Sequence, residues 1–236
     1  RTLHEFLLAG GVPGISGIDT RALTRHIRSI GVMMGILSSE MTLEEALKEV
    51  KDLPKYDLTD FVHEVSTEKP YEWQSSISAT ASLTQALSLE GRGLPHLTSP
   101  LEGEEEGEGE IKQSHKIVVI DLGLKYNMLR ILGQLGCQAS AVPCTISAED
   151  VLALNPDGIV LSPGPGDPTL LDEITQTVRK LIGKKPMMGI CLGHQFIGKA
   201  LGAETFKLKF GHRGGNHPVR DLATGRVYIT AQNHGY

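Results

Sequence analysis

Cys191 stands in the pattern best suited to chemistry, the run GICLGHQ. A short apolar run, PMMGI, precedes the cysteine and a helical pattern follows it, with Gly189 and Gly193 two residues away on either side. This G-x-C-x-G spacing is the thiol counterpart of a nucleophile elbow, in which glycines permit a strained turn that projects the side chain above a sheet. A helix that begins beneath the sulfur favours the thiolate and can stabilise an oxyanion. We therefore predict that Cys191 is a nucleophile rather than an ordinary buried cysteine.

The second candidate is the run LSPGPGDP at residues 161–168, which follows the apolar run GIVLS. Its prolines and glycines favour an open loop whose amides are not committed to the sheet. Gly164 and Gly166 let a ligand approach the backbone closely, because glycine carries no side chain. Composition alone leaves a second interpretation open, namely a rigid turn that leads into the next helix.

The third candidate is the final run TAQNHGY, which follows the apolar run RVYIT. The Asn233 amide can donate and accept hydrogen bonds and Gly235 offers exposed backbone, although Asn-His-Gly also occurs as a plain turn. Upstream, GHRGGNHPV at residues 211–219 is predicted to be a glycine-rich loop. A metal held by His212 and His217 is disfavoured, since this run contains neither a carboxylate nor a thiol.

Alternating strand and helix patterns from His115 onward supply the framework for these runs. Buried β-branched runs and amphipathic helices alternate, which indicates an α/β fold, a mostly parallel sheet with helices on both faces. Because ligands in such folds bind at the carboxyl ends of the strands, the three runs are predicted to face one site. The expected strands are 116–122, 138–143, 158–162, 186–190 and 226–230, and the expected helices are 127–136, 147–154, 171–182 and one from 193 onward.

Upstream, the chain carries helical patterns and then a polar stretch. Apolar residues recur at helix spacing from Thr20 to Ile30, and Thr42 with Glu45 predicts a capping box at the start of a second helix. The polar stretch includes a run of glutamate and glycine whose like charges are predicted to keep it solvated. We interpret residues 1–65 as part of a smaller amino-terminal domain, 66–114 as a linker with an acidic insert, and 115–236 as the α/β domain.

Composition excludes several classes of protein. Of the 236 residues, 40% are hydrophobic and 22% charged, which is enough apolar material for a core. The net charge of −5 disfavours nucleic acid as a partner, and no apolar run reaches the ~18–20 residues of a membrane span. Cys137, Cys144 and Cys191 are too scattered for a disulfide framework, which favours a reduced, cytoplasmic compartment. Since the chain begins at Arg1 rather than Met, a targeting segment before it is left open.

Together these runs resemble a known family. GICLGHQ after LSPGPGDP is similar to the class I glutamine amidotransferases. The runs KFGHRGGNHPV, AQNHGY, GIDTRALTRHIR and YDLTDFVHEVST resemble, more narrowly, the small, glutamine-hydrolysing subunits of carbamoyl phosphate synthetases. The resemblance covers nearly the whole chain apart from the acidic insert.

The resemblance implies an activity and the residues for it. In the family a cysteine attacks the side-chain carboxamide of glutamine, ammonia leaves, and water hydrolyses the glutamyl thioester; Cys191 matches this nucleophile. The backbone amides of Gly166 and Leu192 are implied to stabilise the oxyanion. The positions that match the family's glutamine-binding residues are Gly164, Gly166, Leu192, Gln195, Asn233, Gly235 and Tyr236.

Other parts of the family's machinery are implied to lie outside residues 1–236. They are a histidine oriented by a glutamate two residues later, beyond Tyr236, and a glutamine-binding serine before Arg1. We therefore expect this chain to be a fragment that is inactive by itself. The implied partner is a large subunit that uses ammonia, bicarbonate and ATP with magnesium to make carbamoyl phosphate for arginine and pyrimidine synthesis. This chain is expected to carry no cofactor and no metal.

Two other interpretations stay open at this point. The first is the amidotransferase component of another pathway, such as anthranilate or GMP synthesis, against which the GIDTRALTR region argues. The second is a non-catalytic scaffold with the same fold. The retained Cys191, Gly164, Gly166 and Gln195 argue against that scaffold.

Overall fold

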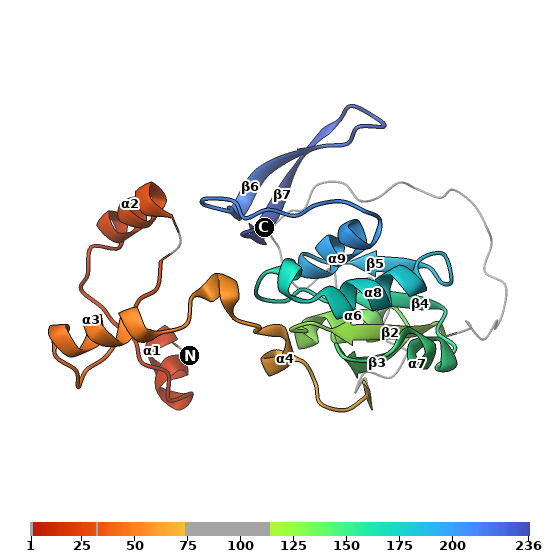
Figure 1. Ribbon diagram of the computed structural model, residues 1–236, viewed down its shortest axis with the longest axis horizontal. Helices are drawn as coiled ribbons and strands as arrows, with labels where there is room; N and C mark the ends of the chain where they lie inside the picture. Colours follow the sequence, from red (N-terminus) through yellow and green to blue (C-terminus); the bar gives the residue numbers. More distant parts are fainter. Residues whose placement is uncertain (1, 32, 74–113) are drawn as a thin grey trace. The chain divides into compact units, whose positions relative to one another are not determined.

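The computed structural model describes residues 2–31, 33–73 and 114–236 (Figure 1), and the predicted acidic insert lies outside these ranges. Its contacts divide the chain into two compact units, which we describe separately. No helix in the described ranges combines the length and apolarity needed to cross a membrane. We call residues 60–204 the sheet unit, and residues 1–59 together with 205–236 the flanking unit.

The sheet unit is built on five strands in the order β1-β3-β2-β4-β5 (Figure 1). Strand β1 pairs antiparallel with β3, whereas every other pairing is parallel. The predicted mostly parallel sheet is thus confirmed. The strands are β1 Tyr71–Glu72, β2 Lys116–Asp121, β3 Gln138–Pro143, β4 Gly158–Leu161 and β5 Met187–Gly189.

Helices cover both faces of this sheet because successive residues of its central strand point to opposite sides. Val118 and Ile120 of β2 pack in one cluster with side chains of α7, α8 and α9, whereas Val119 packs with Leu129 of α6. The predicted helices on both faces are therefore confirmed. The bounds are α4 Val62–Val65, α6 Tyr126–Gln134, α7 Ala148–Ala153, η2 Pro168–Leu170, α8 Asp172–Leu181 and α9 Leu192–Ala200.

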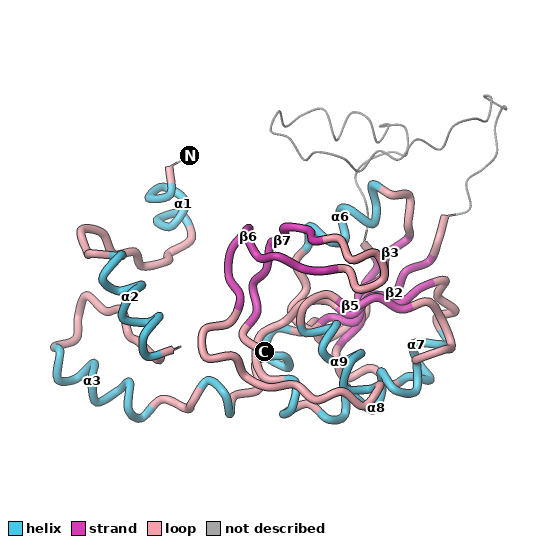
Figure 2. The backbone as a smooth tube through the Cα atoms, turned by 90° about the horizontal axis from the view of Figure 1, so that it is seen from above, coloured by secondary structure: helices cyan, strands magenta, loops and turns pink. Residues whose placement is uncertain are grey.

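The flanking unit consists of short helices and a long β-hairpin (Figure 2). Helix α2 has its predicted bounds, with the Asp19 side chain as its cap, and the predicted capping box of Thr42 and Glu45 opens α3. No residue of α1, α2 or α3 is buried. The elements are α1 Leu3–Ala9, α2 Thr20–Ile30, α3 Leu43–Asp52, η1 Tyr56–Leu58, β6 His212–Arg220 and β7 Val227–His234.

Two sequence predictions about local structure were wrong. The predicted loop at 211–219 is largely strand β6, and β7 continues past the predicted end at Thr230 to His234. The cause is pairing across the hairpin, which places Arg213 opposite Asn233 and outweighs the local preference of glycine for loops. A register irregularity between Gly214 and His217 accommodates part of the glycine-rich run.

The start of the predicted linker also proved to be structured. Tyr71 and Glu72 form the edge strand β1, and Trp73 packs in the cluster around Val119. A two-residue strand carries almost no sequence signal, because its formation depends on the neighbouring strand. The domain bounds as a whole stay a prediction.

Candidate active site

The connections of the sheet create a topological switch point between β2 and β4. The chain leaves β2 for β3 on one side, and leaves β4 for β5 on the other, although β2 and β4 are neighbours. Ligands of α/β folds bind outside the carboxyl ends of strands at such a switch point. The run after β4, residues 161–168, begins at this point, and the run around Cys191 follows the adjacent strand β5.

Cys191 has the strained turn that the sequence predicts. Its φ of 53° and ψ of −110° lie outside the regions that side-chain-bearing residues normally occupy, and Cys191 caps the amino end of α9. The turn is fixed by backbone bonds on both sides, since the Ile190 amide donates to Leu161 at 3.1 Å and the Gly193 amide to Ile190 at 3.0 Å. The geometry presents a partly exposed thiol at a helix N-terminus.

The two glycines of the elbow are required by space. A Cβ at Gly189 would lie 2.4 Å from the carbonyl carbon of Gly193, and a Cβ at Gly193 would lie 2.4 Å from the Leu161 oxygen. A Cβ does not come this close to an atom to which it is not bonded. The elbow therefore packs directly on β4 and on its own first helical turn, which fixes the backbone beneath the sulfur.

The loop after β4 lies equally close to its neighbours. A Cβ at Gly164 would be 2.0 Å from the Leu122 oxygen and 2.8 Å from Leu192 Cδ2. The loop thus touches both the end of β2 and the first residue of the elbow helix. Gly166, with a φ of 91°, adopts a conformation that favours glycine.

Ser162 fixes the start of this loop and Asp121 fixes the turn after β2 that packs against it, two roles that the sequence did not predict. The buried Ser162 hydroxyl accepts from the Leu122 amide at 2.8 Å and donates to the Pro163 carbonyl at 2.9 Å. One carboxylate oxygen of the buried Asp121 accepts from the amides of Gly123 and Leu124, at 2.9 and 2.7 Å. The available signal was a short polar residue at each strand end, where such side chains bind loop amides.

The thiols of Cys191 and Cys144 occupy contrasting environments. Burial raises the pKa of the Cys144 thiol, which is only 3% exposed at the end of β3. Cys191 is partly exposed, at the amino end of the nine-residue helix α9. Cys191 is therefore more accessible to a reacting group than Cys144.

The predicted glutamine-binding set is divided between the two units. Four of its positions belong to the sheet unit with Cys191, namely Gly164, Gly166, Leu192 and Gln195. There the backbone N–H of Gln195 donates to the backbone carbonyl of Cys191 at 3.1 Å.

The remaining three positions, Asn233, Gly235 and Tyr236, belong to the flanking unit. There Arg213 Nη1 donates to Asn233 Oδ1 at 2.7 Å and the Leu208 amide donates to the Gly235 carbonyl at 2.8 Å. These bonds fix the end of β7 within its own unit.

The histidines of the hairpin lie close together. The His212 ring centroid is 5.2 Å from that of His217 and 4.8 Å from that of His234. Within the described ranges, however, no three His, Cys, Asp or Glu side chains are arranged to hold a metal ion.

The fold and the elbow define a class of protein, and comparison with known families gives the same class. The family described as glutamine amidotransferase class-I matches residues 118–236, half of the chain, and the chain belongs to it. A second family, described as carbamoyl-phosphate synthase small chain, CPSase domain, matches residues 1–37.

Three similar proteins found by sequence comparison are named as the same kind of chain. The chain is 45% identical over 235 residues to the carbamoyl phosphate synthase small chain of Akkermansia muciniphila, and 44% identical over 236 residues to that of Syntrophotalea carbinolica. It is 40% identical over 240 residues to the chloroplastic small chain of Arabidopsis thaliana. Each match covers 100% of this chain and 56%, 57% and 50% of the relative, so the chain spans about half their length. These findings agree with the resemblance stated from the sequence.

One solved structure also matches part of the chain, but its likeness is weak. A Thermoplasma acidophilum protein described as a GMP synthase subunit is 33% identical, and the match covers 43% of this chain and 52% of that protein. Its TM-score of 0.38 is too low to support an argument about fold or function.

Proposed function

We propose that the chain is the glutamine-hydrolysing part of a carbamoyl phosphate synthase small chain. The observation that carries the proposal is Cys191, held at positive φ between two glycines at the start of α9. A buried structural cysteine does not require this strain, whereas a nucleophile that must project from a strand end does. The match of residues 1–37 favours this small chain over the amidotransferases of other pathways.

In the proposed reaction the Cys191 sulfur attacks the side-chain carboxamide carbon of glutamine. The amides of Gly166 and Leu192 stabilise the oxyanion, a contribution that is worth about 10²–10³-fold per donor in other acyl-transfer enzymes. Ammonia then leaves, and water hydrolyses the thioester to glutamate. The proposed substrate contacts are Gly164, Gly166, Leu192, Gln195, Asn233, Gly235 and Tyr236.

The remaining components belong to the proposal as well. A histidine and a glutamate in a segment beyond Tyr236 would activate the thiol, so His194, exposed on α9, is not assigned as the base. The proposed partner is a large chain that receives the ammonia and binds ATP and magnesium, which leaves this chain without a cofactor. The proposed compartment is the cytoplasm, although the Arabidopsis thaliana relative is named as chloroplastic.

The decisive test is covalent labelling of the 236-residue chain with the diazoketone analogue of glutamine, followed by peptide mass spectrometry. We expect the label on Cys191, protection by L-glutamine but not by D-glutamine, and no label in Cys191→Ser. Cys137 and Cys144 serve as internal controls, since both remain in that variant. Labelling of Cys144 with Cys191 unmodified would contradict the proposal.

The link to carbamoyl phosphate is tested separately, with the complete small chain and its large chain. Cys191→Ser is expected to abolish glutamine-dependent synthesis of carbamoyl phosphate while leaving synthesis from free ammonia intact. Loss of both activities would mean that the substitution damages the assembly rather than the glutamine reaction.

A further inference from the structure

The segment Asp60–Thr67, which we call the brace, is the first part of the sheet unit and lies along the carboxyl ends of its strands. The Ser66 hydroxyl accepts from the Cys144 amide at the end of β3, at 2.9 Å. The Thr67 amide donates to Asp121 at the end of β2, at 3.0 Å. The brace therefore binds the ends of β3 and β2, and β2 borders the switch point beside β4.

Gly123 connects the brace to the loop after β4. A Cβ at Gly123 would lie 3.0 Å from Pro165 Cδ, 3.1 Å from Gly164 Cα and 3.3 Å from Val65 Cγ2. Gly123 is thus enclosed between the brace on one side and the loop on the other. The carboxylate of Asp121 joins the same group, because it accepts from Gly123 as well as from the brace.

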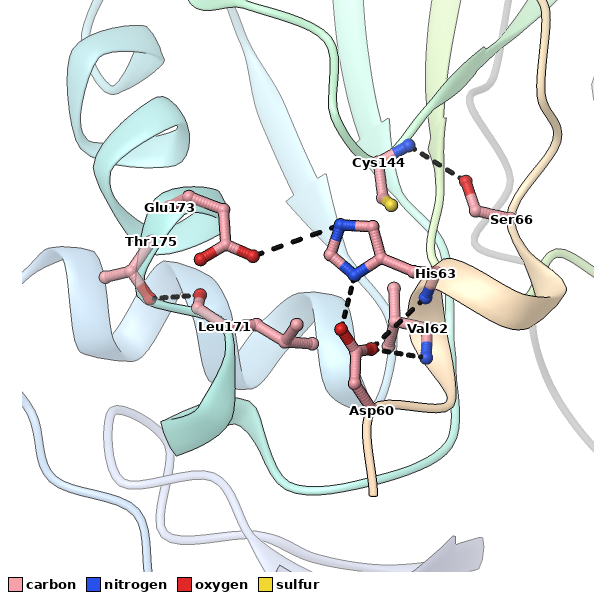
Figure 3. A network of polar contacts seen from close by, with 8 residues as sticks. All are labelled: Asp60, Val62, His63, Ser66, Cys144, Leu171, Glu173 and Thr175. Carbon is pink, nitrogen blue, oxygen red and sulfur yellow. Dashed lines mark hydrogen bonds and ion pairs between the residues drawn. The ribbon is translucent and has the colours of Figure 1, made fainter. Parts of the chain in front are cut away.

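A carboxylate–imidazole–carboxylate array anchors the other end of the brace (Figure 3). One Asp60 oxygen accepts from the amides of Val62 and His63 at 3.1 and 3.2 Å, and the other lies 2.5 Å from His63 Nδ1. His63 Nε2 faces Glu173 in the first turn of α8, with 4.0 Å to its carboxylate oxygen. The array thus joins the brace to the helix that follows the loop.

Packing beneath the array keeps the two segments together. Val62, 1% exposed, belongs to the same apolar cluster as Leu171, the residue that precedes α8, and Figure 3 shows both beside the array. The loop 162–167 is therefore held between β4 at its start and the His63-anchored helix at its end. Movement at either end would displace the backbone at Gly164 and Gly166.

We propose that His63 is a positioning residue for the glutamine reaction: it fixes the brace against α8 and so sets the loop that carries Gly164 and Gly166. This inference rests on the proposed function of that loop. It assigns His63 no contact with glutamine. Its side chain is 38% exposed, so the two carboxylates hold it mainly in place rather than adding much global stability.

The chain offers a matched control in His115. That histidine lies before β2 at the opposite end of the sheet, with Nδ1 3.8 Å from Asp157, and its side chain is 69% exposed. We would compare His63→Ala, His63→Gln and His115→Ala. The His63→Gln variant is a partial rescue, since the introduced amide can still donate to one of the carboxylates.

The kinetic test measures saturable labelling of Cys191 by the diazoketone and, in parallel, alkylation by iodoacetamide, which needs no glutamine pocket. For His63→Ala we expect the maximal diazoketone rate to fall roughly 3- to 10-fold, well short of the ~10²-fold that about 1 Å of misplacement can cost. Iodoacetamide alkylation should change less than about 2-fold, since the elbow itself is intact. His63→Gln should recover part of the rate, and His115→Ala should match wild type. Equal diazoketone rates in His63→Ala and wild type would overturn the inference.

Hydrogen exchange gives a readout that needs no reactivity at Cys191. In His63→Ala, peptides over 121–124 and 162–170 should exchange faster, and in His115→Ala they should not. Unchanged exchange in both regions would overturn the inference even if the wild type failed to react with the diazoketone, a failure that would count against the proposed function alone.

Discussion

The sheet unit and the flanking unit bury their apolar residues to very different extents. Phe196 and Leu161 of the sheet unit are fully buried, whereas Leu23, Ile27 and Ile30 on the amphipathic helix α2 are 48%, 38% and 56% exposed. A parallel sheet with crossover helices encloses its own core, since each strand is covered on both faces. Apolar periodicity therefore predicted helices in both units, but it predicted burial only where the same unit supplies the opposing surface.

The largest difference is expected from truncating one phenylalanine in each unit. Phe196→Ala should lower the free energy of unfolding of the sheet unit by about 3–5 kcal/mol, because it empties a site with no exposed area. Phe206→Ala, at a residue of the flanking unit that is 73% exposed, should change this free energy of unfolding by less than about 0.5 kcal/mol. The fluorescence of Trp73, the single tryptophan, reports urea unfolding of the sheet unit in both variants. Similar losses in the two variants would remove the contrast between the units.

A pair of glycine substitutions should give the next largest effect. Gly193→Ala forces a Cβ toward the Leu161 oxygen and should lower the free energy of unfolding by about 1–3 kcal/mol. The same substitution should abolish diazoketone labelling of Cys191. Gly215→Ala in β6 meets no atom within 4 Å and should leave both properties unchanged. Urea unfolding and labelling rates measure the two outcomes. A Gly193→Ala protein with normal labelling would show that the elbow tolerates a shifted backbone.

Within the sheet unit, the two contrasting thiols should differ in reactivity. Since burial raises the pKa of Cys144, its thiolate fraction at about pH 8 falls below that of an ordinary cysteine. Iodoacetamide should therefore alkylate Cys144 more slowly than Cys191, since the thiolate is the nucleophile and Cys144 is also the more buried of the two. Raising the pH should accelerate Cys144 until its own pKa is passed. Rates should converge in urea; a persistent difference there would point to local sequence rather than burial.

Removing one helix cap in each unit should give the smallest effects. Ser147→Ala removes the cap of α7, whose Val151 is buried in the core, and should lower sheet-unit stability by about 1 kcal/mol. Thr42→Ala removes the equivalent bond from α3, which buries no residue, so only local exchange of α3 amides should accelerate. Trp73 fluorescence and hydrogen exchange separate the two responses. A drop in Trp73-detected stability for Thr42→Ala would show that α3 supports the sheet unit.

Prediction from sequence succeeded where the signals are local. Helix α2 begins and ends as predicted because its signals are local: the cap Asp19 directly precedes the helix, and the regular apolar spacing lies within it. It failed for β6, whose glycines favour a loop until β7 supplies partners, and for β1, whose two residues become a strand only beside β3. Pairing between distant segments leaves no comparable signal in a single sequence.

For the candidate site, the position of Cys191 after a strand and between two glycines can be read from adjacent residues. The contacts that hold the neighbouring loop in place come from the three-dimensional packing instead. Ser162 and His63 lie in the runs LSPGPGDP and YDLTDFVHEVST, but nothing in those runs predicts what the two side chains contact. The hydrogen bonds of Ser162 to Leu122 and of Asp121 to Thr67 join residues 40 and 54 positions apart. The residue type sets the chemistry of a side chain, whereas the groups that orient it are brought near by the fold.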